Sequence, residues 1–398
     1  MRHVDQNTNE DKPTETVDLT PYDVDAPAHH YVNHLAEISP DDTEHFLNVG
    51  IDATAQNRSA TFIQKDSSVI HACAKQNGVE VLPISKARKK HGWLEDYMWR
   101  AVDPASDAYT ARTKDFPHEG YFIRTDPGAR IFNPVQSCLY IAKNGFSQNV
   151  HNVVIAEPDS QLQVITGCAT APHLTSAMHV GVSEFYIKKG AKLFFTMIHH
   201  WGKQINVRPR TVIHVEEGGV LVSNFISLKP VGSLQMYPTT YLNGPGAVAR
   251  FNSILVAGRG STLDVGSRVV LNAPRTRAEI ISRAIVNGGE IIARGELIGN
   301  SEHIKAHLEC RGLILKKGMM RAIPELRGFI PGVEMSHEAA VGKIDQREIE
   351  YLMARGLDEE SAVSTIVRGF LNVEIEGLPA GLKQKIDAII KETEKDMM

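Results

Sequence analysis

The sequence contains few cysteines, few aromatic residues and no long apolar run. Its 398 residues include four cysteines and 7% aromatic residues. Four scattered thiols cannot form a disulfide framework, so each is either a buried small apolar residue or a reactive thiol. No segment approaches the roughly 20 apolar residues that cross a bilayer, and the first residues lack the apolar segment of a signal peptide. We therefore expect no membrane association and a cytoplasmic location.

The charge balance also excludes a class of partner. The formal net charge is −4 at pH 7, and the basic residues are spread along the chain. This distribution gives no electrostatic reason to expect nucleic acid. The expected partners are proteins or small ions.

The composition changes along the chain and predicts four regions. Residues 1–25 are polar and poor in large apolar side chains, so we expect a disordered tail. Residues 26–118 show mixed helical and strand patterns, and Ser39 followed by Pro40 predicts a helix start there. Residues 119–325 consist of short β-rich runs, and residues 326–398 show helical periodicity.

The glycine spacing predicts the fold of the central region. Turn glycines recur at intervals of 28 residues, from Gly190 to Gly218 and from Gly218 to Gly246. Short strands without intervening amphipathic helices argue against βαβ units and favour a solenoid. We predict a mainly β protein whose core is a right-handed parallel β-helix, flanked by an N-terminal α/β segment and a C-terminal α-helical segment. A large jelly roll is the alternative.

The C-terminal region has two clear helical stripes. Gly356 is the predicted end of the first helix, Asp358 is the predicted N-cap of the second, and Pro379 opens a third. The apolar positions of the first two helices are Ile349, Leu352, Val363, Ile366, Val367 and Phe370. Such stripes form either a core or a partner surface.

Two segments of the C-terminal region resemble a known family. Ser336-His337-Glu338 with its flanking residues, followed by residues 350–370, is similar to the C-terminal signature of the SufB/SufD family. Members of this family are scaffolds that assemble iron–sulfur clusters with a SufC-type ABC ATPase. The resemblance implies a β-helix core and ATPase docking on the helices of residues 347–370.

A second resemblance concerns Gly167-Cys168 and Trp201. In SufB, a cysteine after glycine and a tryptophan one coil further on line an interior path for persulfide sulfur. The resemblance implies a sulfur relay by Cys168, His199 and Trp201, although His199 stands where SufB has glutamine. The alternative for Cys168 is a packed core cysteine.

A relay thiol must become a thiolate, which requires nearby positive charge or hydrogen-bond donors. The candidates in the sequence are His199, His200, Arg208 and Arg210. Two further positions depart from SufB, because Tyr140 and Ala142 replace its arginine and asparagine.

A third resemblance concerns the cluster site. SufB has a second cysteine where this chain has Gly318-Met319-Met320, and SufD has a cysteine where this chain has Met335. Cys310 is therefore the only thiol in the C-terminal half. We expect Cys310, His337 and Glu338 to hold a transient iron–sulfur cluster, [4Fe-4S] or [2Fe-2S], since such clusters accept histidine in known cases. A structural hydrogen bond is the alternative role of His337.

The sequence thus predicts a scaffold rather than an enzyme. A two-fold axis would bring two copies of the His337-Glu338 motif together in a homodimer. The expected partners are the ABC ATPase, a second copy, a sulfur donor and apo iron–sulfur proteins. The sequence contains no Walker-type loop, no Gly-x-Ser-x-Gly and no His-Glu-x-x-His, so ATP hydrolysis must come from the partner.

Two other functions compete with this prediction. The first is a SufD-like structural subunit that holds the ATPase without a cluster. The second is a β-helical carbohydrate-active enzyme, which needs paired carboxylates facing a groove, and no such pair recurs on neighbouring coils.

Overall fold

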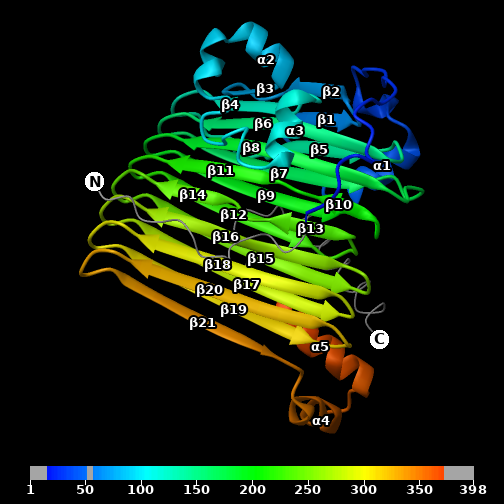
Figure 1. The fold of residues 1–398 in the computed structure, drawn as a ribbon, viewed down its shortest axis with the longest axis vertical. Helices are drawn as coiled ribbons and strands as arrows, with labels where there is room; N and C mark the ends of the chain where they lie inside the picture. Colours follow the sequence, from blue (N-terminus) through cyan, green and yellow to red (C-terminus); the bar gives the residue numbers. More distant parts are fainter. Residues whose placement is uncertain (1–15, 52–56, 372–398) are drawn as a thin grey trace.

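The predicted fold class is confirmed. A computed structural model of the protein describes residues 16–51 and 57–371. It is mainly β, with 48% strand and 15% helix, and its core is a parallel β-solenoid of about eight turns. Figure 1 shows the coils stacked along the long axis, with α2 (Ile84–Lys90) at one end and α4 (Gln346–Ala354) at the other.

The solenoid consists of two sheets that enclose a lumen. In spatial order, sheet 1 contains β2 (Ser68–Ala74), β1 (Ala60–Lys65), β5 (Val135–Ile141), β7 (Gln161–Thr170), β9 (Lys192–His200), β12 (Val220–Ser227), β15 (Val248–Gly258), β17 (Arg277–Asn287), β19 (Lys305–Ile314) and β21 (Glu334–Gly342). Sheet 2 contains β10 (Ile205–Val207), β13 (Ser233–Met236), β16 (Thr262–Leu271), β14 (Thr239–Leu242), β11 (Arg210–Val215), β8 (Ala177–Ile187), β6 (Phe146–Ala156), β4 (Tyr121–Thr125) and β3 (Val79–Pro83), and β16 continues to β18 (Glu290–Gly299) and β20 (Met319–Gly328).

The helices lie mainly at the two ends of the solenoid. In addition to α2 and α4 they are α1 (Pro40–Leu47), α3 (Ala108–Asp115), α5 (Glu359–Leu371) and the short 3₁₀ helices η1 (Leu35–Glu37) and η2 (Gly92–Asp96). The predicted helix starts are confirmed, because the Ser39 hydroxyl and the Asp358 carboxylate each accept a backbone N–H of the following turn. Gly356 ends α4 with a φ of 97°. Among these helices, none is long and apolar enough to span a membrane.

Strand register determines which side chains face the lumen. Strands of successive coils pair in parallel, so that Leu139, Cys168 and His199 align on β5, β7 and β9. Because alternate side chains of a strand face opposite sides of a sheet, each such column lies wholly inside or wholly outside. The predicted turn glycines fit this geometry, since Gly218 and Gly246 adopt φ values of 64° and 72° that side chains with a Cβ disfavour.

The strand ladder extends beyond the predicted core of residues 119–325. β1 already pairs in parallel with β5, and β21 pairs along its whole length with β19. β21 was missed because it is polar, and its hydrogen-bonded neighbour rather than its own sequence specifies it as a strand. The division of the chain into domains stays a prediction.

Part of the predicted N-terminal tail is ordered on the solenoid. The Asp23 N–H donates to the Gly145 carbonyl at 2.8 Å, and Tyr22 packs beside Tyr109 of α3. Residues 1–15 and the third predicted C-terminal helix lie outside the described residues.

A buried carboxylate joins the N-terminal segment to the solenoid. Glu184 on β8 accepts the backbone N–H groups of residues 99–102, at 2.6 to 3.1 Å, and contacts His151 Nε2 at 2.7 Å. Its side chain is fully buried. Burial by itself raises the pKa of Glu184, but the bonds from His151 and the backbone outweigh it, so the net pKa lies below the ordinary value of 4.5.

We predict that Glu184→Gln destabilises the protein by about 3 kcal/mol, because removal of one partner of a buried charged pair leaves unpaired groups behind. Since the native pKa is depressed, this stabilisation is present above about pH 4.5 and is lost as the pH falls through the native pKa. Chemical denaturation at neutral pH measures the effect. The exposed pair Lys189–Glu217 provides the control, since Glu217→Gln should change stability by less than about 1 kcal/mol. Equal effects of the two variants would contradict the anchoring role of Glu184.

Candidate functional site

Cys168 faces the lumen near the N-terminal end of the solenoid. It is 1% exposed and aligns with His199 on the next coil. Its neighbour Gly167 faces the other side of sheet 1, where an added Cβ would collide with Val49 of the N-terminal segment. The structure therefore brings Cys168 and His199, two of the predicted relay residues, together inside the solenoid.

Trp201 completes this group. Its ring lies 5.3 Å from that of His199 and 5.1 Å from that of His179, measured between ring centroids. His199 and His200 point to opposite faces as expected for a strand, since His199 is buried whereas His200 is half-exposed. His179 was not predicted, because only the stacking of coils places β8 beside Trp201.

The positive charges expected around Cys168 are absent from its surroundings in the described part of the chain. Arg208 and Arg210 lie on the outer side of sheet 2, where Arg208 bonds Ser233 and Arg210 pairs with Asp107. Burial raises the pKa of the Cys168 thiol above its ordinary 9.0 and lowers the pKa of His199 below 6.5. At rest Cys168 is therefore a neutral thiol among neutral rings.

A second thiol faces the lumen further along the solenoid. Successive strands align Met197, Phe225, Ser253, Ser282 and Cys310 in one inward column. The first four of these residues line a lumen cavity of about 50 Å³. Cys310 is 4% exposed, and burial raises its pKa to about 11. Thus the two predicted functional cysteines lie towards opposite ends of the same lumen.

The predicted cluster ligands do not converge within one chain. Glu338 pairs in register with Glu309 on the outer face of sheet 1, whereas Cys310 faces the lumen. His337 shares the lumen side with Cys310, one strand further on and aligned with Leu308. Among the described residues, no group of three or more His, Cys, Asp and Glu side chains is placed to hold a metal ion. A single copy therefore lacks the expected three-ligand site.

An ion-pair ladder holds Glu338 on the outer face. Arg283 and Arg311 contact Glu309 at 2.8 and 2.6 Å, and Arg311 reaches Glu338 at 3.9 Å. Glu338 keeps 68% of its side chain exposed. This carboxylate is therefore accessible from outside the chain.

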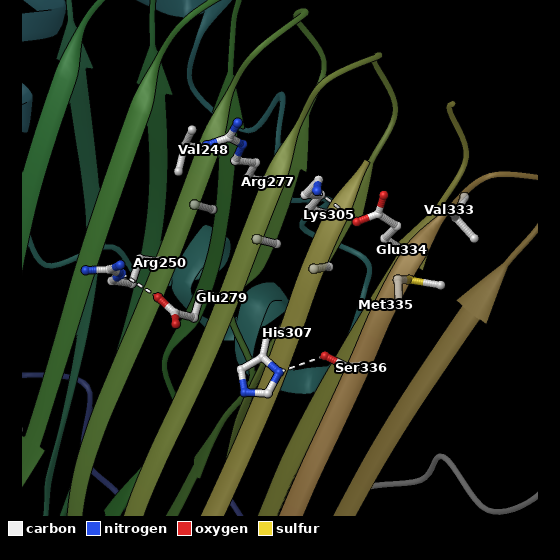
Figure 2. A pocket seen from close by; sticks show the side chains of 13 residues that line it. Val248, Arg250, Arg277, Glu279, Lys305, His307, Val333, Glu334, Met335 and Ser336 are labelled. Carbon is white, nitrogen blue, oxygen red and sulfur yellow. Dashed lines mark hydrogen bonds and ion pairs between the residues drawn. The ribbon is translucent and has the colours of Figure 1, made fainter. Parts of the chain in front are cut away.

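The same outer face carries a groove near the cluster motif. It has a volume of about 700 Å³ and crosses β15, β17, β19 and β21. Figure 2 shows its polar rows, in which Lys305 pairs with Glu334 and His307 Nδ1 contacts Ser336 Oγ at 2.9 Å. Each of these interactions links β19 to β21 and fixes the strand that carries His337 and Glu338.

The predicted partner helices are partly buried by their own chain. Ile349 and Val367 are 7% and 1% exposed, and Val367 belongs to the main hydrophobic core. Leu352, Val363, Ile366 and Phe370 are half-buried. The exposed apolar residues in this region are instead Tyr351, Met353 and Leu357.

Comparisons with known proteins identify the family. The model of the SUF system FeS cluster assembly SufBD core domain matches residues 139–370. The chain is 48% identical to an iron–sulfur cluster assembly SufBD family protein of Archaeoglobus fulgidus, over 90% of this chain and 96% of the relative. The chain belongs to the SufBD family. It is also 45% identical to a SufBD family protein of Methanothermobacter thermautotrophicus, over 92% of each chain.

A more distant SufBD relative carries a subunit name. The iron–sulfur cluster assembly protein SufB of Bacillus subtilis is 27% identical over 89% of this chain and 78% of that protein. The matched core domain contains Cys168, Trp201, Cys310 and His337. The resemblance inferred from the sequence motifs is therefore confirmed at the level of the family.

The burial of the cysteines predicts a simple reactivity pattern. Cys73 is exposed, whereas Cys138, Cys168 and Cys310 are buried. Because the thiolate is the reactive form and burial raises the pKa of all three buried thiols, iodoacetamide should modify Cys73 of the native protein first at pH 8. Peptide mass spectrometry measures the order, and all four thiols should react after denaturation. Labelling of native Cys310 as fast as Cys73 would contradict its position in the lumen.

Proposed function

We propose that this SufBD protein is an iron–sulfur cluster assembly scaffold that works in the cytoplasm with a SufC-type ABC ATPase. The main support is the arrangement of the lumen, in which Cys168 and Cys310 face inward on either side of a narrow cavity. Cys168 receives persulfide sulfur, with His199 and Trp201 beside it, and Cys310 lies towards the C-terminal end. Catalysis of ATP hydrolysis belongs to the partner.

We propose further that the C-terminal end of the solenoid forms a homodimer interface. β21 is the last strand of sheet 1, and apolar side chains are exposed around this end, namely Met319, Phe329, Ile330 and Val341 at 38% to 66%. Unpaired edge strands with apolar surface are sites of chain association. Association with a second copy at this end would pair the edge of β21 and bury the exposed apolar side chains.

The dimer would assemble the ligands that one chain lacks. Cys310 and His337 share the lumen side of sheet 1 at its C-terminal end, whereas Glu338 is exposed on the outer side. A cluster at the mouth of the lumen would take Cys310 and His337 from one copy and Glu338 from the other. The cluster, [4Fe-4S] or [2Fe-2S], is cargo for apo proteins, and a mixed ligand set suits its transient binding.

We predict that the protein purified anaerobically with its ATPase contains iron and sulfide. Cys310→Ala should remove the cluster, because it removes the one thiolate at the mouth, and His337→Ala and Glu338→Ala should weaken its retention about tenfold. Iron and sulfide counted per dimer, with sedimentation to confirm the dimer, measure the effect.

Cys73→Ala, which removes an exposed thiol from β2 at the other end of sheet 1, is the matched control and should keep full cluster content. A colourless, iron-free native complex would favour the alternative, a SufD-like subunit that holds the ATPase without a cluster. The separation of Cys310 and Glu338 on opposite faces of sheet 1 is the observation that keeps this alternative open.

The docking surface for the ATPase is proposed on α4 and α5, with Ile349, Leu352, Val363, Ile366, Val367 and Phe370 as the predicted contact stripe. Val367 and Ile349 are buried within the chain. In this proposal they hold the two helices in place and do not contact the ATPase directly. Tyr351 and Met353, which are 58% and 41% exposed on α4, would make the contact itself.

We predict that Tyr351→Asp weakens ATPase binding by about 2 kcal/mol or more, since a buried aromatic anchor commonly dominates an interface. Titration calorimetry of the two purified proteins measures the loss. Phe132→Asp serves as the control, because Phe132 is equally prominent at 65% exposure but precedes β5 near the opposite end of the solenoid. Unchanged affinity of the Tyr351 variant would remove α4 from the interface.

A further inference from the structure

The lumen beside Cys168 contains polar atoms that no residue of the described chain satisfies. His199 Nδ1 and Trp201 Nε1 are fully buried without a hydrogen-bond partner there. Their side chains are 4% and 3% exposed. Burial of a polar group without a hydrogen-bond partner is unfavourable, so a cluster of such groups points to a ligand.

His179 also lies in this part of the lumen. Its hydrogen bond to Gln148 determines which of its two ring nitrogens carries the proton. His179 pairs in register with Gln148, and its strand neighbours Met178 and Val180 pack outside the solenoid. The Gln148 side-chain amide donates to the Asp66 and Tyr140 carbonyls, at 2.8 and 3.2 Å. Gln148 Oε1 therefore faces His179 Nδ1, 3.0 Å away, and His179 must carry its proton on Nδ1.

The other ring nitrogen of His179 is consequently a bare acceptor. Burial lowers the pKa of His179 to about 3, so the ring stays neutral. Gly181 lies on the same face of β8, and an added Cβ there would come within 3.0 Å of Nε2. The glycine thus leaves the space beside this nitrogen open.

We propose that Gln148, His179 and Trp201 form a binding site for the protonated outer sulfur of a Cys168 hydropersulfide. His179 Nε2 accepts the S–H hydrogen, and the Trp201 N–H donates to a sulfur lone pair. Gln148 is a positioning residue that fixes the tautomer of His179. The proposal rests on the relay role of Cys168 and adds the form in which the sulfur is held.

The surroundings of Cys168 in the lumen favour a neutral hydropersulfide over a hydropersulfide anion. Among the described residues, burial, and no charged group, shifts the pKa of Cys168, and a buried unpaired charge is unfavourable. One acceptor and one donor match an S–H group, which both donates and accepts. The anion is the nucleophilic form of a hydropersulfide. Protonation therefore suppresses reaction of the outer sulfur while it is held at Cys168.

Two substitutions of His179 separate this role from a structural one. In His179→Asn the side-chain amide takes the place of Nδ1–H and retains the bond to Gln148, but the Nε2 acceptor is lost. In His179→Gln the amide reaches the Nε2 position, where its oxygen accepts, and the bond to Gln148 is lost. Gly181→Ala crowds the acceptor and leaves both residues of the pair in place.

The test uses full-length protein with Cys73→Ser, so that the exposed thiol takes up no sulfur. The protein is treated anaerobically with inorganic polysulfide and desalted, and the fraction of Cys168 that keeps one added sulfur atom is measured by mass spectrometry of alkylated peptides. Thermal unfolding confirms that each variant is folded.

We expect His179→Asn and Gly181→Ala to retain about tenfold less persulfide, as loss of one hydrogen bond to a buried group implies. His179→Gln should retain more than His179→Asn. Retention by folded His179→Asn and Gly181→Ala equal to that of the parent would overturn the site while leaving the relay intact. Absence of persulfide from Cys168 of the parent would overturn the relay and the site together.

Discussion

The hydrogen-bonded alignment of strands from coil to coil determines where every side chain of the solenoid points. Because side chains alternate between the two faces of a strand, the face of one residue in a column sets the face of the whole column. Cys168 shares its column with His199, and Cys310 shares its column with Met197 and Phe225. The same rule places Glu338 outside, beside Glu309.

Some polar groups of the lumen are paired between neighbouring coils. Ser137 and Thr166 contact each other at 2.7 Å, and Gln148 binds His179. These pairs lie in the first coils, whereas the cavity further along is lined largely by Phe and other apolar side chains. His199 Nδ1, Trp201 Nε1 and Ser227 Oγ, which is aligned with His199, are among the buried side-chain atoms of the described residues without a hydrogen-bond partner. A ligand that accepts the Trp201 N–H would remove the cost of leaving that group unpaired.

The sequence predicted turns and helix ends, because these features depend on residues that are close together in the chain. Turn glycines such as Gly218 need positive φ, and Asp358 caps the helix that follows it, so both were visible without the structure. β21 was not, because its pairing with β19 specifies it. Nor could the sequence show that Cys310 faces the lumen or that His179 lies beside Trp201. Those positions depend on register, and a shift of one residue would reverse them.

The two lumen thiols, Cys168 and Cys310, differ in how readily they ionise to thiolates. Burial raises the pKa of both. At Cys310 the charge of Arg283 lowers the pKa and that of Glu309 raises it, and the net pKa is about 11. Arg283 belongs to the ladder of Glu309 and Arg311 on the outer face. An anionic sulfur is therefore less costly at Cys310 than at Cys168. In the proposed transfer, neutral sulfur held at Cys168 would gain nucleophilic character as it approaches Cys310, the proposed cluster ligand.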